Sequence, residues 1–401
     1  MSVLRAYRGL FSNRPLVRLL GGEFVSSIGD WLYLVALLIV VYQVSQDPLI
    51  LGIVGAARIL PYVLLSIPAG IVADRYDRRL VLLVTDLARG SIMLAMAWLV
   101  NTDGPLLAIV GLAILATCFS CFFGPTIGAY LPDLVRDENE LGPANSAWST
   151  LDNLAFVIGP AVAALLIGLS GLTLAFLLNA VSFAVIAVVL WRLPSVRGDR
   201  GGAASAAPAE DIQSPTAGTA RPAATPIDRR MLVPLAGLGL IDTVAGFVFG
   251  GLGVLTVIIA VDQLGLDDAA TGLLNAAVGV GGIVGAVGSS AFVVRPALRL
   301  PLVIGGFGLA IGVAALGFSA SLGPALVAMA LASAGSLLTE VVSTTIFQRT
   351  VPNVIRGRAL GVIATISTLA YAAGSLVLPV ASGVVGIDRV LLASAVLVAV
   401  G

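Results

Sequence analysis

Ionisable side chains stand inside several of the long apolar stretches of this sequence. Seven stand out: Glu23, Asp30, Arg58, Asp86, Asp152, Asp242 and Glu340. Charged groups in apolar surroundings are costly to place there and are functional candidates by default. A carboxyl group held away from water can load and release a proton near neutral pH. Because the chain has no histidine, carboxylates must carry out any proton relay.

Asp30 and Arg58 are expected near the middle of a membrane, on adjacent helices. With a rise of about 1.5 Å per residue, Asp30 lies roughly 18 Å beyond Arg18, and Arg58 lies roughly 13 Å from the opposite face. The two can form an ion pair, which lowers the cost of burying each charge. One interpretation is that Asp30 exchanges a proton and that Arg58 modulates the proton affinity of Asp30. The alternative is a static, structural pair.

Four carboxyl groups are expected to share one central cavity with Arg58. Glu23 and Asp30 are seven residues apart and therefore lie on one helix face. Asp242 occupies nearly the position of Glu23 in the second half of the chain, and Glu340 lies deep in a later span. Four acids against one deep arginine favour a cationic substrate.

The remaining charges in the spans are given other roles. Asp86 and Arg89 have the i,i+3 spacing of a local salt bridge, and we expect them to belong to a gate at the cytoplasmic end. The face on which Asp152 lies is not fixed by the sequence. Cys118 and Cys121 have no histidine or second cysteine pair to complete a metal site, so we expect them to pack as small apolar side chains.

Long apolar segments position these residues. Hydrophobic residues make up 58% of the chain, and its mean hydropathy is +1.05. A membrane span needs about 20 mainly apolar residues. Twelve such spans are predicted, of which the last is short, so that we expect the natural protein to continue beyond Gly401: 18–42, 49–73, 80–101, 105–131, 143–168, 172–191, 232–261, 269–294, 301–320, 323–347, 358–383 and 387–401.

The spans divide into two halves around a polar interval. Residues 1–193 and 231–401 each hold six spans, and residues 194–230 are rich in Pro, Ala, Ser, Thr and Gly, which predicts a flexible linker. The halves repeat at an offset of 220, since Leu131-Pro-Asp-Leu-Val-Arg136 matches Val351-Pro-Asn-Val-Ile-Arg356. The sequence therefore predicts an all-α integral membrane protein of two pseudo-symmetric six-helix bundles.

Arginines fix the expected orientation. Nineteen of the 22 basic residues fall in loops on one side, and Arg389 alone falls in the opposite loops. By the positive-inside rule, the N-terminus and the linker are cytoplasmic in a plasma membrane.

A charged turn joins the second and third spans. It runs from Gly70 through Asp74, Arg75, Arg78 and Arg79, and it must face water. Its Gly-x-x-x-Asp-Arg-x-x-Arg-Arg order resembles the loop signature of the major facilitator superfamily. That resemblance implies that Asp74, Arg75 and Arg79 latch the two halves together on the cytoplasmic side and stabilise an outward-facing state. The alternative is that these charges only enforce orientation.

Two further motifs point to one branch of that family. Gly29-Asp-Trp-Leu-Tyr-Leu-Val-Ala36 is similar to the drug–proton antiporter branch that includes macrolide efflux proteins and enterobactin exporters. Gly159-Pro160 keeps the centre of the exporter signature of the fifth helix, although alanines replace both outer glycines. The resemblance implies a hinge at Gly159 and Pro160, and the alternative is a merely kinked helix.

These observations predict a secondary transporter that exports lipophilic small molecules by alternating access, coupled to protons. Two alternatives stay open: uptake or facilitated diffusion of a nutrient or lipid, and a transporter-derived membrane receptor. We expect no enzymatic activity, no metal, no cofactor beyond the proton gradient and no nucleic-acid partner. The expected partners are a small-molecule substrate and the lipid bilayer, and we expect a monomer.

Overall fold

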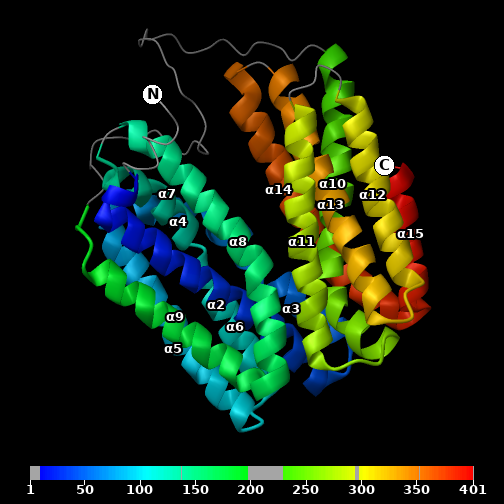
Figure 1. The fold of residues 1–401 in the computed structure, drawn as a ribbon, viewed down its shortest axis with the longest axis horizontal. Coiled ribbons are helices and arrows are strands. Elements are labelled where there is room, and N and C mark those ends of the chain that lie inside the picture. Colours follow the sequence, from blue (N-terminus) through cyan, green and yellow to red (C-terminus); the bar gives the residue numbers. More distant parts are fainter. Residues whose placement is uncertain (1–9, 137, 197–228, 294–297, 352, 401) are drawn as a thin grey trace.

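The computed structural model describes residues 10–136, 138–196, 229–293, 298–351 and 353–400, and its elements are helices (Figure 1). They are α2 (Arg14–Ser45), α3 (Pro48–Ala57), α4 (Leu60–Arg75), α5 (Arg78–Asn101), α6 (Leu106–Ser120), α7 (Phe123–Leu134), α8 (Glu138–Ser170), α9 (Leu172–Trp191), α10 (Arg229–Ile258), the π-helical turn η1 (Ile259–Gln263), α11 (Asp268–Val293), α12 (Arg299–Gly317), α13 (Leu322–Thr350), α14 (Asn353–Val385) and α15 (Ile387–Val400).

Local sequence signals start several of these helices. The side chains of Asn13, Asp47 and Asp77 accept hydrogen bonds from backbone N–H groups in the first turns of α2, α3 and α5. Prolines follow the first two caps, where the missing N–H is not needed. These caps fix the ends of helices whose interiors are almost wholly apolar.

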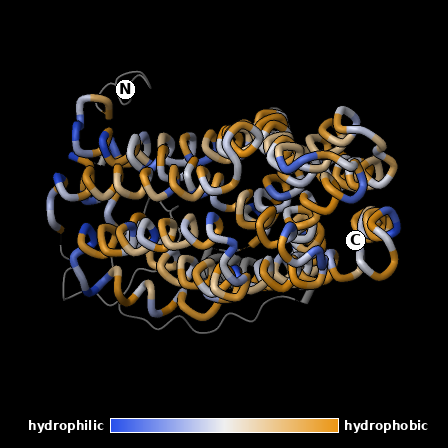
Figure 2. Tube along the Cα trace, turned by 90° about the horizontal axis from the view of Figure 1, so that it is seen from below, coloured by the Kyte–Doolittle hydropathy of each residue, from blue (hydrophilic) through white to orange (hydrophobic). Residues whose placement is uncertain are grey.

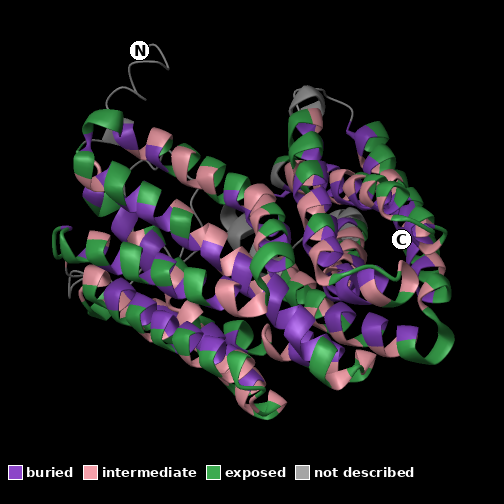
Figure 3. Ribbon diagram, turned by 60° about the horizontal axis from the view of Figure 1, so that its bottom comes forward, coloured by how far each residue is buried: buried purple, intermediate pink, exposed green. Residues whose placement is uncertain are grey.

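Eleven segments of the described chain are long and apolar enough to cross a membrane, and α15, with 14 residues, follows them. Figure 2 shows hydrophobic residues along most of the helices and hydrophilic residues gathered mainly near their ends. Exposed residues face outward along the helices, and buried residues gather on their inner sides (Figure 3). The twelve-helix architecture with a short last helix is thus confirmed.

Two predicted spans are broken rather than continuous. The span 49–73 divides into α3 and α4 at Arg58 and Ile59, and the span 105–131 divides into α6 and α7 at Cys121 and Phe122. A helical proline removes one hydrogen bond and clashes with the carbonyl four residues earlier. Pro61 places that clash at Ala57, the last residue of α3, and Pro125 places it at Cys121, the residue after the end of α6.

Small residues hold neighbouring helices together within the second half. A Cβ on Gly312 of α12 would lie 2.7 Å from the backbone oxygen of Ala328 on α13. A Cβ on Gly335 of α13 would lie 2.6 Å from the oxygen of Gly305. Such backbone approach replaces the hydrophobic force that is missing between helices in lipid.

The two halves meet along α3 and α14 and along α8 and α11 (Figure 1). A Cβ on Gly52 would lie 2.9 Å from the backbone oxygen of Leu376, and a Cβ on Gly272 would lie 2.6 Å from the Cα of Ala164. The halves converge toward the end where α2 finishes and stand apart at the opposite end (Figure 1).

Side-chain hydrogen bonds close the converging end. The hydroxyl of Tyr42, near the end of α2, donates to the carboxylate of Asp262 in η1. Gln43 donates to Asp268 at the start of α11, at 2.6 Å. Both bonds join the first half to the second, so we call these four residues the closed-end contacts.

The predicted domain boundaries are 1–193, 194–230 and 231–401. Helix α10 begins at Arg229, and residues 197–228 lie outside the described residues, so the flexible linker stays a prediction. The first residues of that interval are described. Tyr130 donates to the Pro194 carbonyl at 2.7 Å, and the backbone N–H of Arg78 donates to Val196 at 3.1 Å.

Candidate functional site

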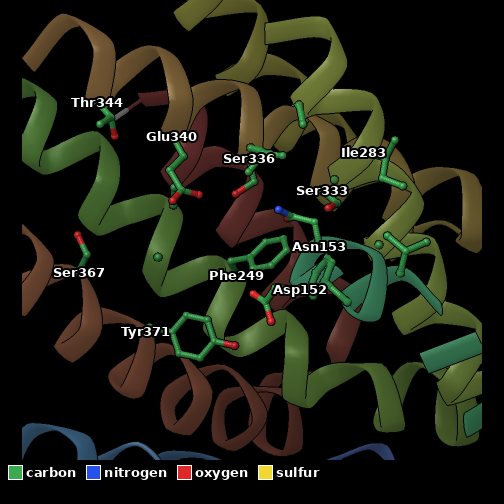
Figure 4. Close-up of a pocket in the computed structure, with 18 of the residues that line it drawn as sticks. Asp152, Asn153, Phe249, Ile283, Ser333, Ser336, Glu340, Thr344, Ser367 and Tyr371 are labelled. Carbon is green, nitrogen blue, oxygen red and sulfur yellow. The ribbon is translucent and has the colours of Figure 1, made fainter. Parts of the chain in front are cut away.

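A cavity of about 1030 Å³ lies between the two halves (Figure 4). Helices α2 and α8 of the first half and α10, α11, α13 and α14 of the second half contribute to its wall. Its aromatic lining consists of Trp31, Phe156, Phe249 and Tyr371. The wall is therefore mainly apolar and suited to a lipophilic molecule.

Three carboxyl groups interrupt this apolar wall. Asp152 comes from α8, Asp242 from α10 and Glu340 from α13, and none of the described lining residues is basic. Asp242 and Glu340 are close enough to interact electrostatically. Figure 4 shows Asp152 and Glu340 directed toward the space around Phe249. We call these three residues the cavity acids.

Helical spacing brings the polar residues of α13 to the cavity. Ser333, Ser336, Glu340 and Thr344 follow one another at three- and four-residue intervals, so they lie on one face. Ser333 donates to the carbonyl of Val278 on α11 at 2.6 Å, which fixes that face against the neighbouring helix.

A second group of charges lies inside the first half. Arg89 of α5 forms ion pairs with Asp86 and, at 3.4 Å, with Asp30 of α2. Asn179 of α9 donates to the other oxygen of Asp30 at 3.4 Å. We call Glu23, Asp30, Asp86 and Arg89 the paired cluster.

Burial and aromatic rings hold the paired cluster in place. Asp86 and Arg89 are buried, and the guanidinium of Arg89 lies 4.3 Å from the ring centre of Phe183 and 5.4 Å from that of Phe123. Glu23 is 4% exposed, and its Oε1 has no hydrogen-bond partner among the described residues. A carboxyl group in this position is suited to holding a proton, because an unpaired buried charge is costly.

The predicted ion pair between Asp30 and Arg58 is wrong for this conformation. Arg58 lies at the break between α3 and α4, where its guanidinium is 5.7 Å from the ring centre of Tyr33. Arg89 of α5 reaches Asp30 instead, because α9 packs against both α2 and α5 and brings these two side chains together beside Asn179. The i,i+3 salt bridge of Asp86 and Arg89 is present, but it belongs to the paired cluster.

The predicted single cavity with four acids is also not formed. Asp242 and Glu340 line the cavity together, whereas Glu23 and Asp30 belong to the paired cluster. Asp152, whose face the sequence did not fix, is the third cavity acid. Glu23 and Asp152 meet at a narrow space of about 10 Å³ between α2 and α8, so this space joins the two groups.

The charged turn makes its described contacts within the first half. Arg78 pairs with Asp133 of α7, and Arg79 donates to the carbonyl of Leu193 at 2.9 Å. Asp74 and Arg75 are exposed, and a Cβ on Gly70 would meet no atom within 4 Å. A latch between the halves formed by Asp74, Arg75 and Arg79 therefore stays a prediction for a different conformation.

Gly159 and Pro160 lie within α8, which continues through them. A Cβ on Gly159 would lie 2.5 Å from the Cβ of Trp31, so the glycine lets α2 and α8 approach closely. Trp31 and Phe156 also meet edge to face, with ring centres 4.9 Å apart. A hinge at these two residues stays a prediction.

Some contributors escaped the sequence-based prediction. Asn179 is the one amide side chain in the span 172–191, whose other polar side chains are the hydroxyls of Thr173 and Ser182, and that contrast is a usable signal. The closed-end contacts gave no such signal, because Tyr42, Asp262 and Asp268 lie near predicted loops where polar residues are ordinary.

Comparisons with known proteins place the chain. Residues 19–375 match the model of the Major Facilitator Superfamily. Macrolide efflux protein A of Streptococcus pyogenes is 26% identical over 45% of this chain and 44% of its own length. The multidrug efflux pump Tap of Mycobacterium tuberculosis (strain ATCC 25618 / H37Rv) is 30% identical over 40% of each chain. The chain thus matches less than half the length of these curated relatives.

A solved structure shares the fold. A bacterial homologue of the human lysosomal transporter Spinster, in an inward-facing and occupied conformation, aligns with a TM-score of 0.74. The alignment covers 96% of this chain and 94% of that chain at 13% identity.

Proposed function

The chain belongs to the Major Facilitator Superfamily of membrane transporters, and on that premise we propose that it exports lipophilic, cationic small molecules in exchange for protons. One observation carries the substrate class: three carboxyl groups project from the apolar wall of the cavity, and its described lining residues include no basic side chain. An acidic site in low dielectric attracts a cation and disfavours an anion.

The direction of transport is supported by two observations. The relatives named macrolide efflux protein A and multidrug efflux pump Tap are named for export. The cavity lies in a molecule whose halves are joined by the closed-end contacts. By the arginine distribution, we place that end outside the cytoplasm and the protein in the plasma membrane. The cavity then opens to the cytoplasm, which is the state in which an exporter takes up its substrate.

The paired cluster is the proposed proton site. The side chain of Asp30 is 45% exposed while it pairs with Arg89, so it can exchange a proton and change the pairing. The next residue, Trp31, lines the cavity. A change at Asp30 can therefore be transmitted to the substrate site through one turn of α2.

A second route connects the two groups of charges. Glu23 and Asp152 border the same narrow space, whose volume of about 10 Å³ is close to that needed for one water molecule. A proton can pass between the paired cluster and the cavity acids along this route.

Uptake of a dye into inverted membrane vesicles tests the proposal, because an exporter moves its substrate into the interior of such vesicles. Vesicles that contain the full chain should accumulate ethidium, a lipophilic cation, when the interior is acidified, and should lose it when the proton gradient is collapsed. Vesicles without the protein serve as the control. Accumulation that does not respond to the gradient would favour facilitated diffusion. A ligand response without net flux would favour the receptor alternative.

A further inference from the structure

Arg58 is a deep guanidinium without a carboxylate partner. Among the described residues, the ion pairs of the membrane interior involve Arg89, and Arg58 takes part in none. Its Nε is buried and has no hydrogen-bond partner in the described part of the chain. Arg58 is half-buried, and the carboxylate that acts on it from a distance, Asp30, forms its ion pair with Arg89. A ligand that supplies a closer acceptor therefore gains affinity.

A second donor without a partner lies beside it. The ring centre of Tyr33 is 5.7 Å from the Arg58 guanidinium. The Tyr33 hydroxyl is buried close to the Arg58 side chain, and its own proton has no acceptor among the described residues. Tyr33 is 7% exposed, so bulk water does not satisfy this hydroxyl. The Nε–H of Arg58 and the hydroxyl of Tyr33 are thus two neighbouring donors that have no acceptor among the described residues.

Packing between the halves brings this place to the cavity. Gly52 of α3 abuts Leu376 of α14, and from there both helices run toward the cavity. Six residues along α3 lead to Arg58 and five along α14 lead to Tyr371, distances of roughly 9 and 8 Å. Tyr371 lines the cavity and interacts electrostatically with Arg58. Arg58 therefore lies on the far side of Tyr371 from the cavity, and neither Arg58 nor Tyr33 is among the described lining residues.

We propose that Arg58, Tyr33 and Tyr371 form a donor subsite that binds a carboxylate or another strong hydrogen-bond acceptor of the transported molecule. The inference rests on the proposed function and narrows it. The cavity acids bind the cationic group of the substrate, and the donor subsite binds its acceptor group. The preferred substrate is thus an amphoteric, lipophilic molecule rather than a simple lipophilic cation.

Two dyes that differ in one group test this division. Rhodamine B carries a cationic xanthene and a free carboxylate near neutral pH, and rhodamine B ethyl ester keeps the cation but loses the carboxylate. Binding of each dye to the full chain in lipid nanodiscs is followed by fluorescence polarisation. Arg58→Gln should weaken rhodamine B binding by about tenfold or more, since a hydrogen bond to a charged group is worth about 1.5–3 kcal/mol.

The same variant should change the affinity for the ester by less than about twofold, because the ester lacks the full negative charge. Arg58→Lys should restore part of the affinity for rhodamine B. Arg389→Gln, near the start of α15 and outside the cavity lining, is the matched arginine control and should leave both dyes unaffected.

The outcomes separate this inference from the proposed function. Equal weakening of both dyes by Arg58→Gln would assign Arg58 a structural role and overturn the donor subsite, as would no effect on either dye. Weaker binding of the ester by Glu340→Gln would support the cation site, whatever the effect of Arg58→Gln. Rhodamine B binding that depends on Arg58 but not on Glu340→Gln would keep the donor subsite and overturn the cationic-substrate proposal. Binding of neither dye by the unsubstituted chain would overturn both.

Discussion

The two halves of this transporter treat their charges in opposite ways. In the first half, Arg89 of α5 forms ion pairs with both Asp86 and Asp30, the latter on α2. In the second half, Asp242 and Glu340 line the cavity, and no described residue forms an ion pair with them, although Ser343 interacts with Asp242. Paired charges can respond to a proton by changing partners, whereas free carboxylates can respond to a bound cation. Under the proposed function, the first half holds the proton site, and the second half supplies two of the three cavity acids, with Asp152 of the first half as the third.

This contrast arises although the two halves descend from one repeat pattern. The match between Leu131–Arg136 and Val351–Arg356 shows equivalent positions at the ends of two helices. Asp242 lies near the position equivalent to Glu23, but Asp30 and Arg89 have no charged counterparts at an offset of 220. The repeat is therefore retained in the arrangement of the helices, whereas most charged residues within the spans differ between the two halves.

The largest expected effect comes from removing the charge of Asp30. Asp30→Asn should reduce gradient-driven accumulation of ethidium to the level seen with a collapsed gradient, because the variant cannot exchange a proton there. Equilibrium exchange of the dye should persist, since binding and translocation do not require that proton. Asp103→Asn, in the exposed loop after α5, is the matched control. Concentrative uptake by Asp30→Asn at the parental level would remove Asp30 from the coupling mechanism.

The next effect separates the cavity acids from the paired cluster. Glu340→Gln should weaken the binding of tetraphenylphosphonium by about tenfold, equivalent to about 1.4 kcal/mol. Glu23→Gln should change this affinity by less than about twofold, because Glu23 does not line the cavity. Equilibrium binding to the purified protein measures both constants. Similar losses in the two variants would show that the two sites are not separate.

A smaller effect is expected from the closed-end contacts. Tyr42→Phe removes the hydroxyl that donates to Asp262, a bond present in this conformation. A hydrogen bond to a charged group contributes about 1.5–3 kcal/mol, so the population should move toward outward-facing forms. Labelling of a Ser336→Cys reporter in the cavity, with Cys118→Ser and Cys121→Ser in the background, should slow severalfold from the cytoplasmic side. Unchanged labelling would mean that the bond does not control the equilibrium.

The charged turn should act in the opposite direction and more weakly. If Asp74 contacts the second half in the outward-facing state alone, Asp74→Asn should raise labelling of the same Ser336→Cys reporter. We expect an increase of about twofold, because exposed charge contacts contribute about 1 kcal/mol or less. Asp133→Asn, which affects a contact within the first half, is the comparison variant. Slower labelling in Asp74→Asn would contradict the latch.

The smallest effect is expected from the linker. Deletion of residues 203–220, which lie outside the described residues, leaves 19 residues of the interval 194–230. Fully extended, these reach roughly 60 Å, enough to join two adjacent bundles. Transport of ethidium should therefore be retained. A large loss at normal expression and insertion would show that the linker binds or gates something, in favour of the receptor alternative.

Hydropathy was sufficient to predict the spans, because the bilayer imposes length and polarity on each helix directly. The family was predictable from the motif of the charged turn. Depth along a helix was likewise predictable: Asp242 and Glu340 were expected in one cavity and are found there. The charged turn follows from its five charges in a chain that is 11% charged.

Pairings between helices were not predictable, because depth does not determine the direction in which a side chain points. Arg58 and Arg89 are both within reach of Asp30 by depth alone, and the choice depends on how α2 and α5 each pack against α9. The break before Pro61 then turns Arg58 toward Tyr33. The proline in the sequence was a signal for this break. The resulting direction of the Arg58 side chain could be seen only once the packing of the helices was known.

The closed-end contacts have an electrical consequence. A water-filled cavity that enters the membrane from one side carries the potential of that side inward, so the transmembrane voltage falls mainly across the layer that remains closed. In this conformation that layer contains Tyr42, Asp262 and the close seam of Gly272 and Ala164. A charge that crosses it gains or loses about 2.3 kcal/mol per 100 mV. The membrane voltage can thus act on a charge that moves only across this thin layer. The closely packed small residues of the seam exclude water and ions from it.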